Sequence, residues 1–267
     1  MIAILIVSCV VAFVAYRFQQ EVQEGYQYAG RKAAPVKSWV LPVPPLYKNI
    51  LQKYFRYYQW LSPGNKNKFE RKVCNFLYSK RFIPRNIDEV TIEAKILIAA
   101  SAVQLTFGLH NNYLQHFDKI LVYPNEYYSS ITKQYHKGEV NPRFGIIVLS
   151  WNNFVEGYVR AQDSVNLGLH EMAHALRLEN MIRHSEYKFF DEGLVSRFDE
   201  YARVICRSPQ EYANFFRPYA RTNEHEFFSV AIENFFERPE LFQQQVPELY
   251  VTITHLLGQD PLKLKQP

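Results

Sequence analysis

The sequence predicts an α+β fold that is mostly helical, with a small central β-sheet. Two apolar runs in the middle of the chain, Lys119–Tyr123 and Phe144–Trp151, are typical of strands. The second run either offers an edge to an extended peptide or lies inside the sheet with no free edge. The segments on both sides show the apolar spacing of helices. The 267 residues are 48% hydrophobic and 16% aromatic, which is enough to bury one large domain without disulfides.

The predicted helices begin with a capped segment. Ser62 followed by Pro63 has the form of an N-cap and a first helical residue. A second helix, from Val90 to Phe107, is apolar almost all round, which predicts burial on every face. Later helices are expected at about 164–179, 187–205, 223–238 and 245–257.

The chain opens with an uncharged apolar run, Ile2–Tyr16. Because Arg17 can extend its charge to the interface and Phe18 lengthens the run, we expect a membrane-anchor helix over residues 1–18. A cleaved signal peptide is disfavoured, since no basic residue precedes the run and no small-residue cleavage site follows it. Lipoprotein processing at Cys9 is disfavoured too, because that residue stands too near the start.

Charge and cysteine placement suggest a location for the rest of the chain. A Pro-containing tether is expected over residues 19–45 and a single globular domain over residues 46–267. Basic residues follow the apolar run and none precedes it, which predicts a cytoplasmic domain. Three widely spaced cysteines without a CxxC motif fit a reducing compartment. A net charge of +5 without a Lys/Arg block predicts no nucleic-acid partner.

Residues 170 to 174 read His-Glu-Met-Ala-His, an HExxH motif. On a helix capped by Asp163 or Ser164, His170 and His174 stand one turn apart at about 40° in azimuth. Both imidazoles can therefore bind one metal ion, at Zn–N distances of about 2.0–2.1 Å. Glu171 points to the side, within reach of a metal-bound water. The motif predicts a zinc site.

A catalytic zinc ion needs a third protein ligand. A third His in an HExxHxxGxxH pattern is excluded, because Arg177 and Asn180 occupy the Gly and His positions. A carboxylate is expected instead, and two candidates compete. Glu192 follows in the next predicted helix, and Glu226 lies further on. Spacing alone does not decide between them.

The segment from Tyr219 to Phe228, YARTNEHEFF, resembles the segment that carries the zinc-ligating Glu in anthrax lethal factor. It also resembles the matching segment of the Mlc titration factor A family of zinc peptidases. The resemblance covers roughly residues 50 to 262. Its further motifs are Trp60–Glu70, Lys119–Pro124, Ile147–Trp151 and Phe235–Phe242.

This resemblance implies a zincin-like metallopeptidase domain of the gluzincin type. His170, His174 and Glu226 become the zinc ligands. Glu171 becomes the general base, and Tyr219 becomes the donor to the developing oxyanion. Glu192 is then a helix-surface or supporting group. Glu233, on the face of Glu226, either orients a ligand His or forms a plain salt bridge.

The sequence thus predicts a zinc metallopeptidase that hydrolyses peptide bonds with a zinc-activated water and a Glu general base. Its partners would be a peptide or protein substrate and, through the N-terminal helix, a membrane. The choice between aminopeptidase and endopeptidase stays open. The alternative is a regulatory module that sequesters a transcription factor or another protein, with weak or no peptidase activity. A membrane anchor departs from the best-known bacterial members, which resemble soluble cytosolic proteins.

Overall fold

The computed structural model describes residues 43–110, 114–129, 133–160, 164–182, 189–207 and 215–264. All of them belong to one unit of the chain, Ser38–Pro267. The predicted anchor over residues 1–18 and most of the predicted tether over 19–45 lie outside the described residues. Across the described ranges, every helix is too short or too polar to cross a bilayer.

Helices make up most of the described chain, and the prediction of an α+β fold with a small sheet is confirmed. The helices are α2 (Pro45–Tyr54), α3 (Arg56–Trp60), α4 (Pro63–Ser79), α5 (Ile92–Thr106), α6 (Trp151–Val159), α7 (Leu167–Ile182), α8 (Glu192–Arg207), the 3₁₀ helix η2 (Pro218–Arg221), α9 (Glu224–Glu237), α10 (Pro239–Gln245), α11 (Pro247–Leu257) and α12 (Pro261–Leu264). The strands are β1 (Arg81–Pro84), β2 (Lys119–Tyr123), β3 (Tyr127–Ser129), β4 (Gln134–His136), β5 (Gly138–Asn141) and β6 (Ile146–Ser150).

The central sheet has four strands in the order β1-β2-β6-β5. Strands β1, β2 and β6 are parallel, and β5 pairs antiparallel with β6 at the edge. The predicted strand over Phe144–Trp151 is therefore an interior strand, because β6 is paired on both sides. It is also shorter than expected, since Gly145 turns the chain with φ +62° and Trp151 begins α6. Among the residues that the structure describes, the free edge of the sheet on this side belongs to β5.

Local signals account for the first helices. The Ser62 side chain accepts a hydrogen bond from the Asn65 backbone N–H, so α4 has the predicted N-cap with Pro63 at its first position. Helix α5 begins two residues later than expected, where the Thr91 side chain caps it. Every residue of α5 from Ile98 onward is buried, in agreement with its apolar surface.

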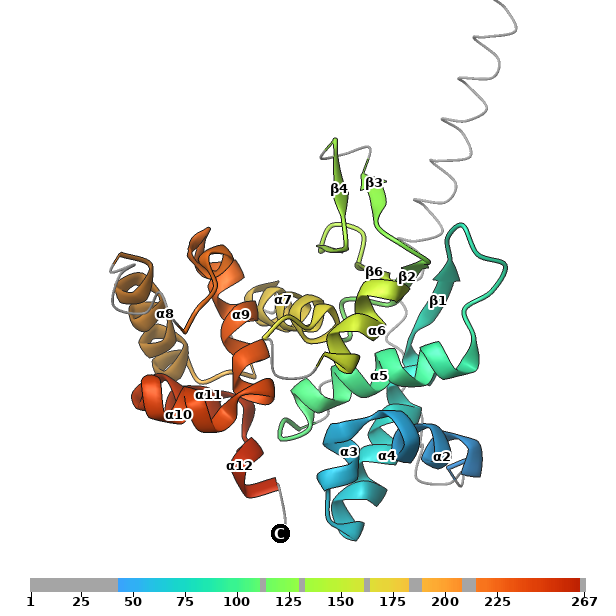
Figure 1. The fold of residues 1–267 in the computed structure, drawn as a ribbon, viewed down its shortest axis with the longest axis horizontal. Helices are drawn as coiled ribbons and strands as arrows, with labels where there is room; N and C mark the ends of the chain where they lie inside the picture. Colours follow the sequence, from blue (N-terminus) through green and yellow to red (C-terminus); the bar gives the residue numbers. More distant parts are fainter. Residues whose placement is uncertain are drawn as a thin grey trace, which may run out of the picture. The chain divides into compact units, whose positions relative to one another are not determined.

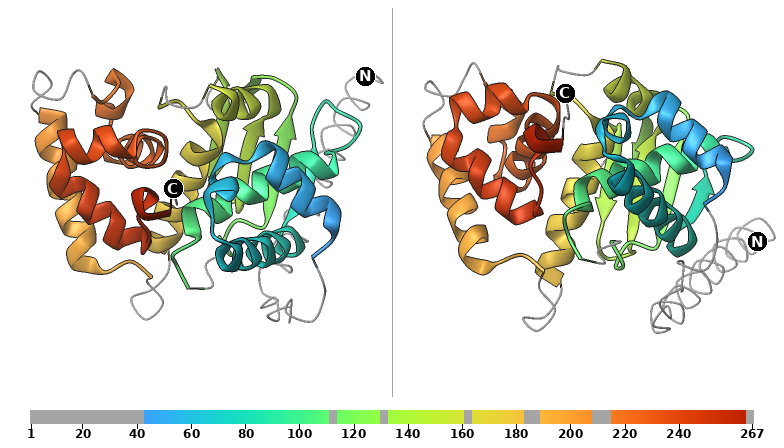
Figure 2. Two further views of the ribbon diagram at one scale, coloured as in Figure 1. Left: turned by 60° about the horizontal axis from the view of Figure 1, so that its bottom comes forward. Right: turned by 90° about the horizontal axis from the view of Figure 1, so that it is seen from below.

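Helix α7 lies between two groups of elements (Figures 1 and 2). On one side it contacts α5, α6 and the strands β5 and β6, and on the other it contacts α9. Helices α8, α10 and α11 pack around α9 in turn. The HExxH helix thus joins the sheet to the C-terminal helices, which are drawn in orange and red.

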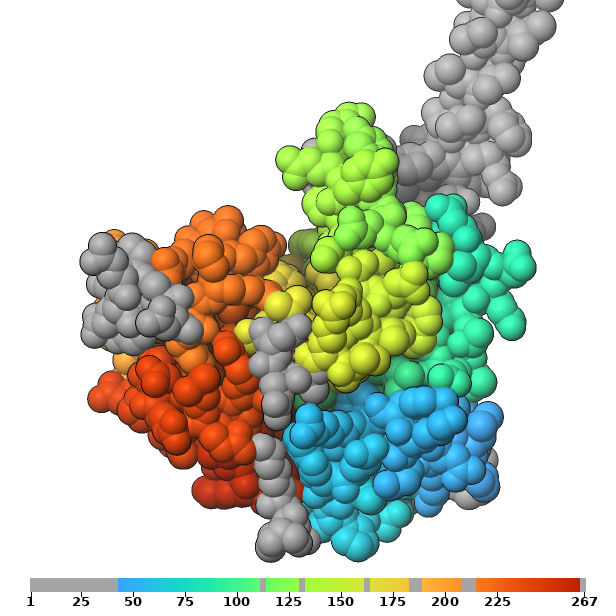
Figure 3. Space-filling model, viewed as in Figure 1, coloured from blue at the N-terminus to red at the C-terminus, as the bar shows by residue number. Residues whose placement is uncertain are grey.

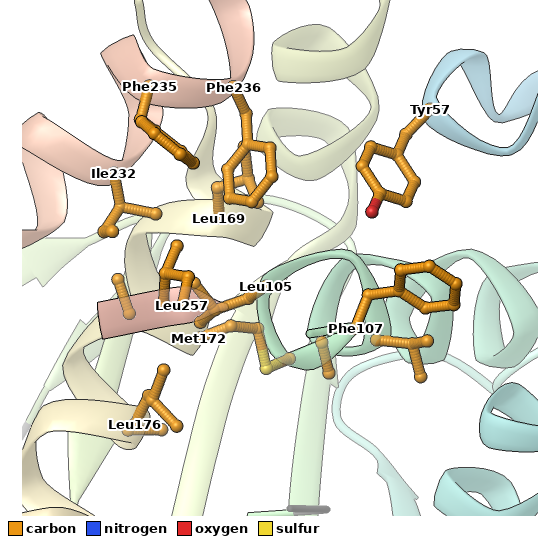
Figure 4. Close-up of a cluster of buried hydrophobic side chains, with 14 of the residues drawn as sticks. Tyr57, Leu105, Phe107, Leu169, Met172, Leu176, Ile232, Phe235, Phe236 and Leu257 are labelled. Carbon is orange, nitrogen blue, oxygen red and sulfur yellow. The ribbon is translucent and has the colours of Figure 1, made fainter. Parts of the chain in front are cut away.

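The core fills the space between α5, α7, α9 and α11 (Figure 4). Leu169, Met172 and Leu176 face this core from α7 and are at most 1% exposed. Ile232 and Phe235 meet them from α9, and both are fully buried. These residues recur every three or four positions, so one face of each helix is apolar. The polar side chains His170, Glu171 and Glu233 lie at other positions of the same two helices and are buried as well.

A two-stranded hairpin, β3–β4, stands apart from the central sheet (Figure 1). The space-filling view shows the surface indented between this green hairpin and the orange segment of η2 and α9 (Figure 3). Yellow atoms of α7 form the floor of the indentation.

Candidate metal centre

Helix α7 carries the HExxH motif and is capped by a residue that the sequence reasoning missed. The Asn166 side-chain oxygen accepts a hydrogen bond from the Leu169 backbone N–H at 3.0 Å. The predicted cap at Ser164 is therefore wrong: this residue has a φ of +61° and stands two residues before the observed cap, Asn166. The other predicted cap, Asp163, lies outside the described residues. Asn is as good an N-cap as Asp or Ser, so the signal was present in the sequence.

The two histidines of the motif bring their Nε2 atoms to within 3.1 Å of each other. The Oε2 atom of Glu226 lies 3.2 Å from the His170 Nε2 atom and 3.3 Å from the His174 Nε2 atom. All three side chains are largely buried, with exposures of 9%, 16% and 18% for His170, His174 and Glu226. Three potential ligand atoms therefore form a nearly equilateral triangle.

The position of Glu226 is set by the start of α9. The Asn223 side chain accepts hydrogen bonds from the backbone N–H groups of His225 and Glu226, at 2.9 and 3.0 Å. This cap begins α9 at Glu224 and leaves Glu226 in the first turn. Because α9 packs along α7, the first turn of α9 brings Glu226 to the two imidazoles.

The triangle fits a metal ion bound by nitrogen and oxygen. Ligands at about 2.0–2.1 Å from a tetrahedral zinc ion lie about 3.3 Å apart, close to the separations of these three atoms. Within the described ranges, His170, His174 and Glu226 form the group of His, Cys, Asp and Glu side chains whose ligand atoms lie close enough to share one ion. In the same ranges, the buried Glu226 Oε2 atom has no hydrogen-bond partner of good geometry, which a cation would supply.

Charges at the centre are strongly coupled. Burial by itself would lower the pKa of His170, but the carboxylates of Glu226 and Glu233 outweigh it and raise that pKa to about 10. Burial would raise the pKa of Glu226, but the two imidazoles beside it hold that pKa well below its usual range. The carboxylates of Glu226 and Glu233 thus stabilise a positive charge at His170, and they would stabilise a bound cation in the same way.

A carboxylate behind His170 fixes the orientation of the ring. The His170 Nδ1–H donates to the Glu233 Oε1 atom at 2.7 Å, so the lone pair of the neutral imidazole would be on Nε2, which faces the triangle. Arg217 also contacts Oε1, at 2.6 Å, and the Asn166 backbone N–H donates to Oε2 at 2.6 Å. Both readings of Glu233 from the sequence are therefore realised, since it orients a histidine and forms a salt bridge.

Glu171 lies beside the triangle and is not part of it. Its side chain is buried, and this burial raises the pKa of Glu171 above its usual value. The carboxylate lies against the backbone of Gly138 in β5: a Cβ atom at Gly138 would come within 2.5 Å of the Glu171 Oε1 atom. No sequence pattern predicted a role for Gly138, because Glu171, which it contacts in space, lies far from it along the chain.

Tyr219 stands at the open side of the centre. Its ring centroid lies 5.9 Å from that of His170, and the residue is 49% exposed. Partial burial and the nearby Glu226 carboxylate raise the pKa of Tyr219, so its hydroxyl group stays protonated and able to donate. By contrast, Glu192 is exposed at the start of α8 and lies outside the group of three ligands.

Comparisons with known proteins agree with this chemistry. The sequence profile described as "Glucose-regulated metallo-peptidase M90" matches residues 31–256. An uncharacterised protein of Synechocystis sp. is 30% identical over 240 residues, which are 83% of this chain and 86% of that protein. Mlc titration factor A of Cronobacter sakazakii is 28% identical over 222 residues, or 76% of this chain and 82% of the relative. Mlc titration factor A of Klebsiella pneumoniae is 27% identical with the same coverage.

Proposed function

Because the chain belongs to the glucose-regulated metallopeptidase family M90, we propose that it is a zinc-dependent peptidase of the gluzincin type. The observation that carries the proposal is the triangle of His170, His174 and Glu226, with the Glu171 carboxylate beside it. Three ligands leave one coordination position for water, as catalytic zinc sites require. A purely structural site would normally be closed by four protein ligands.

The three ligand side chains would hold the ion from two adjacent helices. When bound, zinc acts as a Lewis acid and lowers the pKa of a bound water towards 7. Glu233 would keep the His170 Nε2 lone pair directed at the ion, through its hydrogen bond to Nδ1.

Glu171 and Tyr219 would carry the proton transfer and the charge stabilisation. The Glu171 carboxylate would take a proton from the attacking water and pass it to the leaving amine. The Tyr219 hydroxyl would donate a hydrogen bond to the oxygen of the tetrahedral intermediate. Donors of this kind are worth about 2.7–4 kcal/mol in comparable sites.

The free edge of β5 supports a peptide substrate. Strand β5 runs at the rim of the sheet and contacts α7, and its first residue, Gly138, lies against the Glu171 carboxylate. An extended peptide paired with β5 would make main-chain hydrogen bonds beside the base. This arrangement would bring a scissile bond near Glu171 without requiring any one side chain in the substrate.

Metal content and turnover together test the proposal. Purified full-length protein should contain zinc, hydrolyse generic peptides, lose this activity with a chelator and regain it with added zinc. The variant Glu171→Gln should keep its zinc and lose about 10²–10⁴-fold in kcat. Equal rates for this variant and the wild type would refute the role of Glu171.

The names of the relatives support a second candidate function. Several are called Mlc titration factor A, which describes binding of a regulatory partner rather than hydrolysis. On this reading the chain sequesters a protein partner. Size-exclusion chromatography with purified Mlc separates the two candidates. A stable complex that forms equally with Glu171→Gln, together with no peptide hydrolysis by the zinc-loaded wild type, would favour the regulatory role.

A further inference from the structure

Arg217 lies immediately before η2 and contacts three parts of the candidate metal centre. Its Nη2 atom lies 2.6 Å from the Glu233 Oε1 atom. Its Nη1 atom donates to the Ser164 backbone carbonyl at 2.8 Å, in the segment that leads into α7. Its guanidinium carbon lies 5.7 Å from the centroid of the Tyr219 ring, within the range of a cation–π contact.

The charge of Glu233 needs a partner. Its side chain is 1% exposed, and a buried carboxylate without a counter-charge is strongly unfavourable. Among the described residues, the cationic groups placed against it are His170 and Arg217. A histidine that binds a metal through Nε2 and donates from Nδ1 is a neutral imidazole. Once a metal is bound, Arg217 is therefore the group that balances Glu233.

The contacts of Glu233 also define its orientation. Oε1 accepts from both His170 and Arg217, and Oε2 accepts from the Asn166 backbone N–H. Arg217 fixes the carboxylate from the side of η2, and Asn166 fixes it from the start of α7. The guanidinium fork suits this task, because it can reach a carbonyl and a carboxylate at once.

We propose that Arg217 is a positioning residue: it holds the Glu233 carboxylate in its orientation behind His170, and it supports Tyr219 at the open side of the centre. This inference rests on the function proposed above, and it adds a residue outside the ligands, the base and the oxyanion donor. Arg217 acts on the metal only through Glu233 and His170. Its loss should therefore weaken metal binding without removing a ligand.

The test compares three variants of the full-length protein. In Arg217→Gln the charge is lost, while in Arg217→Lys the charge is kept without the fork. Arg238→Gln is the matched control, because Arg238 also bonds to a backbone carbonyl and lies over an aromatic ring, that of Phe215. The measurements are the zinc Kd from competition with a chromophoric chelator, kcat at saturating zinc, and the Tm of the metal-free protein.

We expect Arg217→Gln to weaken zinc binding about 10-fold, the lower end of the cost of losing the direct partner of a metal-ligating histidine, because Arg217 acts through Glu233. Arg217→Lys should recover part of this loss, and Arg238→Gln should bind zinc like the wild type. At saturating zinc, Tyr219→Phe should reduce kcat less in the Arg217→Gln background than in the wild type, because the two residues act together.

Each outcome decides one claim. Equal zinc Kd values for the wild type and Arg217→Gln would overturn the role of Arg217, while peptide hydrolysis by the wild type would leave the proposed function intact. A loss of zinc affinity as large in Arg238→Gln would also overturn it, since the effect would then be general destabilisation. Conversely, the wild type could bind zinc more tightly than Arg217→Gln and still hydrolyse no peptide. This result would refute the proposed peptidase function and support the positioning role of Arg217.

Discussion

Replacing Gly138 with alanine tests whether strand β5 holds the general base in place. A Cβ atom at this position would lie 2.5 Å from the Glu171 Oε1 atom and 2.7 Å from both Cγ and Cδ. Ordinary contacts between non-bonded heavy atoms are about 3.5–4.0 Å, so the carboxylate must move by about 1 Å. Among the described glycines, only Gly145 and Gly258 have a positive φ. Gly138 is not one of them, so its backbone accepts alanine without strain.

A shift of about 1 Å at a catalytic group can reduce turnover by about 10²-fold. We therefore expect Gly138→Ala to lower kcat by about two orders of magnitude. Zinc content should not change, because Glu171 is not among the three candidate ligands. Peptide hydrolysis at saturating substrate gives kcat, and elemental analysis gives the zinc content.

Gly64→Ala is the matched control, since a Cβ atom at Gly64 meets nothing within 4 Å. A shorter base provides a second check: Gly138→Ala combined with Glu171→Asp should lose no more activity than Glu171→Asp alone, because the aspartate leaves room for the new methyl group. A kcat for Gly138→Ala within twofold of the wild type would refute the contact. The contact would also be refuted if Gly138→Ala reduced kcat by the same factor in the Glu171→Asp background as in the wild type.

Four further results are expected. Glu226→Gln should lose most of its zinc affinity, while Glu192→Gln should bind zinc like the wild type; titration with a chelator would show the reverse if Glu192 were the ligand. Tyr219→Phe should reduce kcat about 10²–10³-fold at constant zinc content, and an unchanged kcat would exclude an oxyanion role. Because the pKa of His170 is raised from 6.5 to about 10, its proton stabilises the metal-free protein below pH about 6.5, an effect lost as the pH rises through 10. Zinc binding near pH 8 should accordingly release about one proton, which calorimetry in buffers of different ionisation enthalpy would detect as a buffer-dependent heat. Met172→Ala should lower the free energy of unfolding by about 2–5 kcal/mol, measured by denaturant titration, because Met172 is fully buried in the core; a change below 1 kcal/mol would contradict that packing.

Local sequence signals determined the elements that carry the centre. The Ser62-Pro63 pair predicted the start of α4, and the run from Lys119 to Tyr123 predicted β2 with both ends correct. The HExxH spacing predicted two imidazoles on one face of a helix, and His170 and His174 lie in that way. These features depend on contacts within a few residues, which the sequence records directly.

The surroundings of the centre were decided by tertiary structure. Spacing left Glu192 and Glu226 equivalent, and only the packing of α9 along α7 brings the Glu226 carboxylate to the histidines, while Glu192 is exposed. The same packing gives Glu233 its contacts with His170 and Arg217. The pairing of β5 with β6 moves the free edge away from the predicted strand and puts Gly138 against Glu171. A sequence specifies which side chains a helix presents, but the partners that neutralise and orient a buried charge come from segments far along the chain, and the fold alone brings them together.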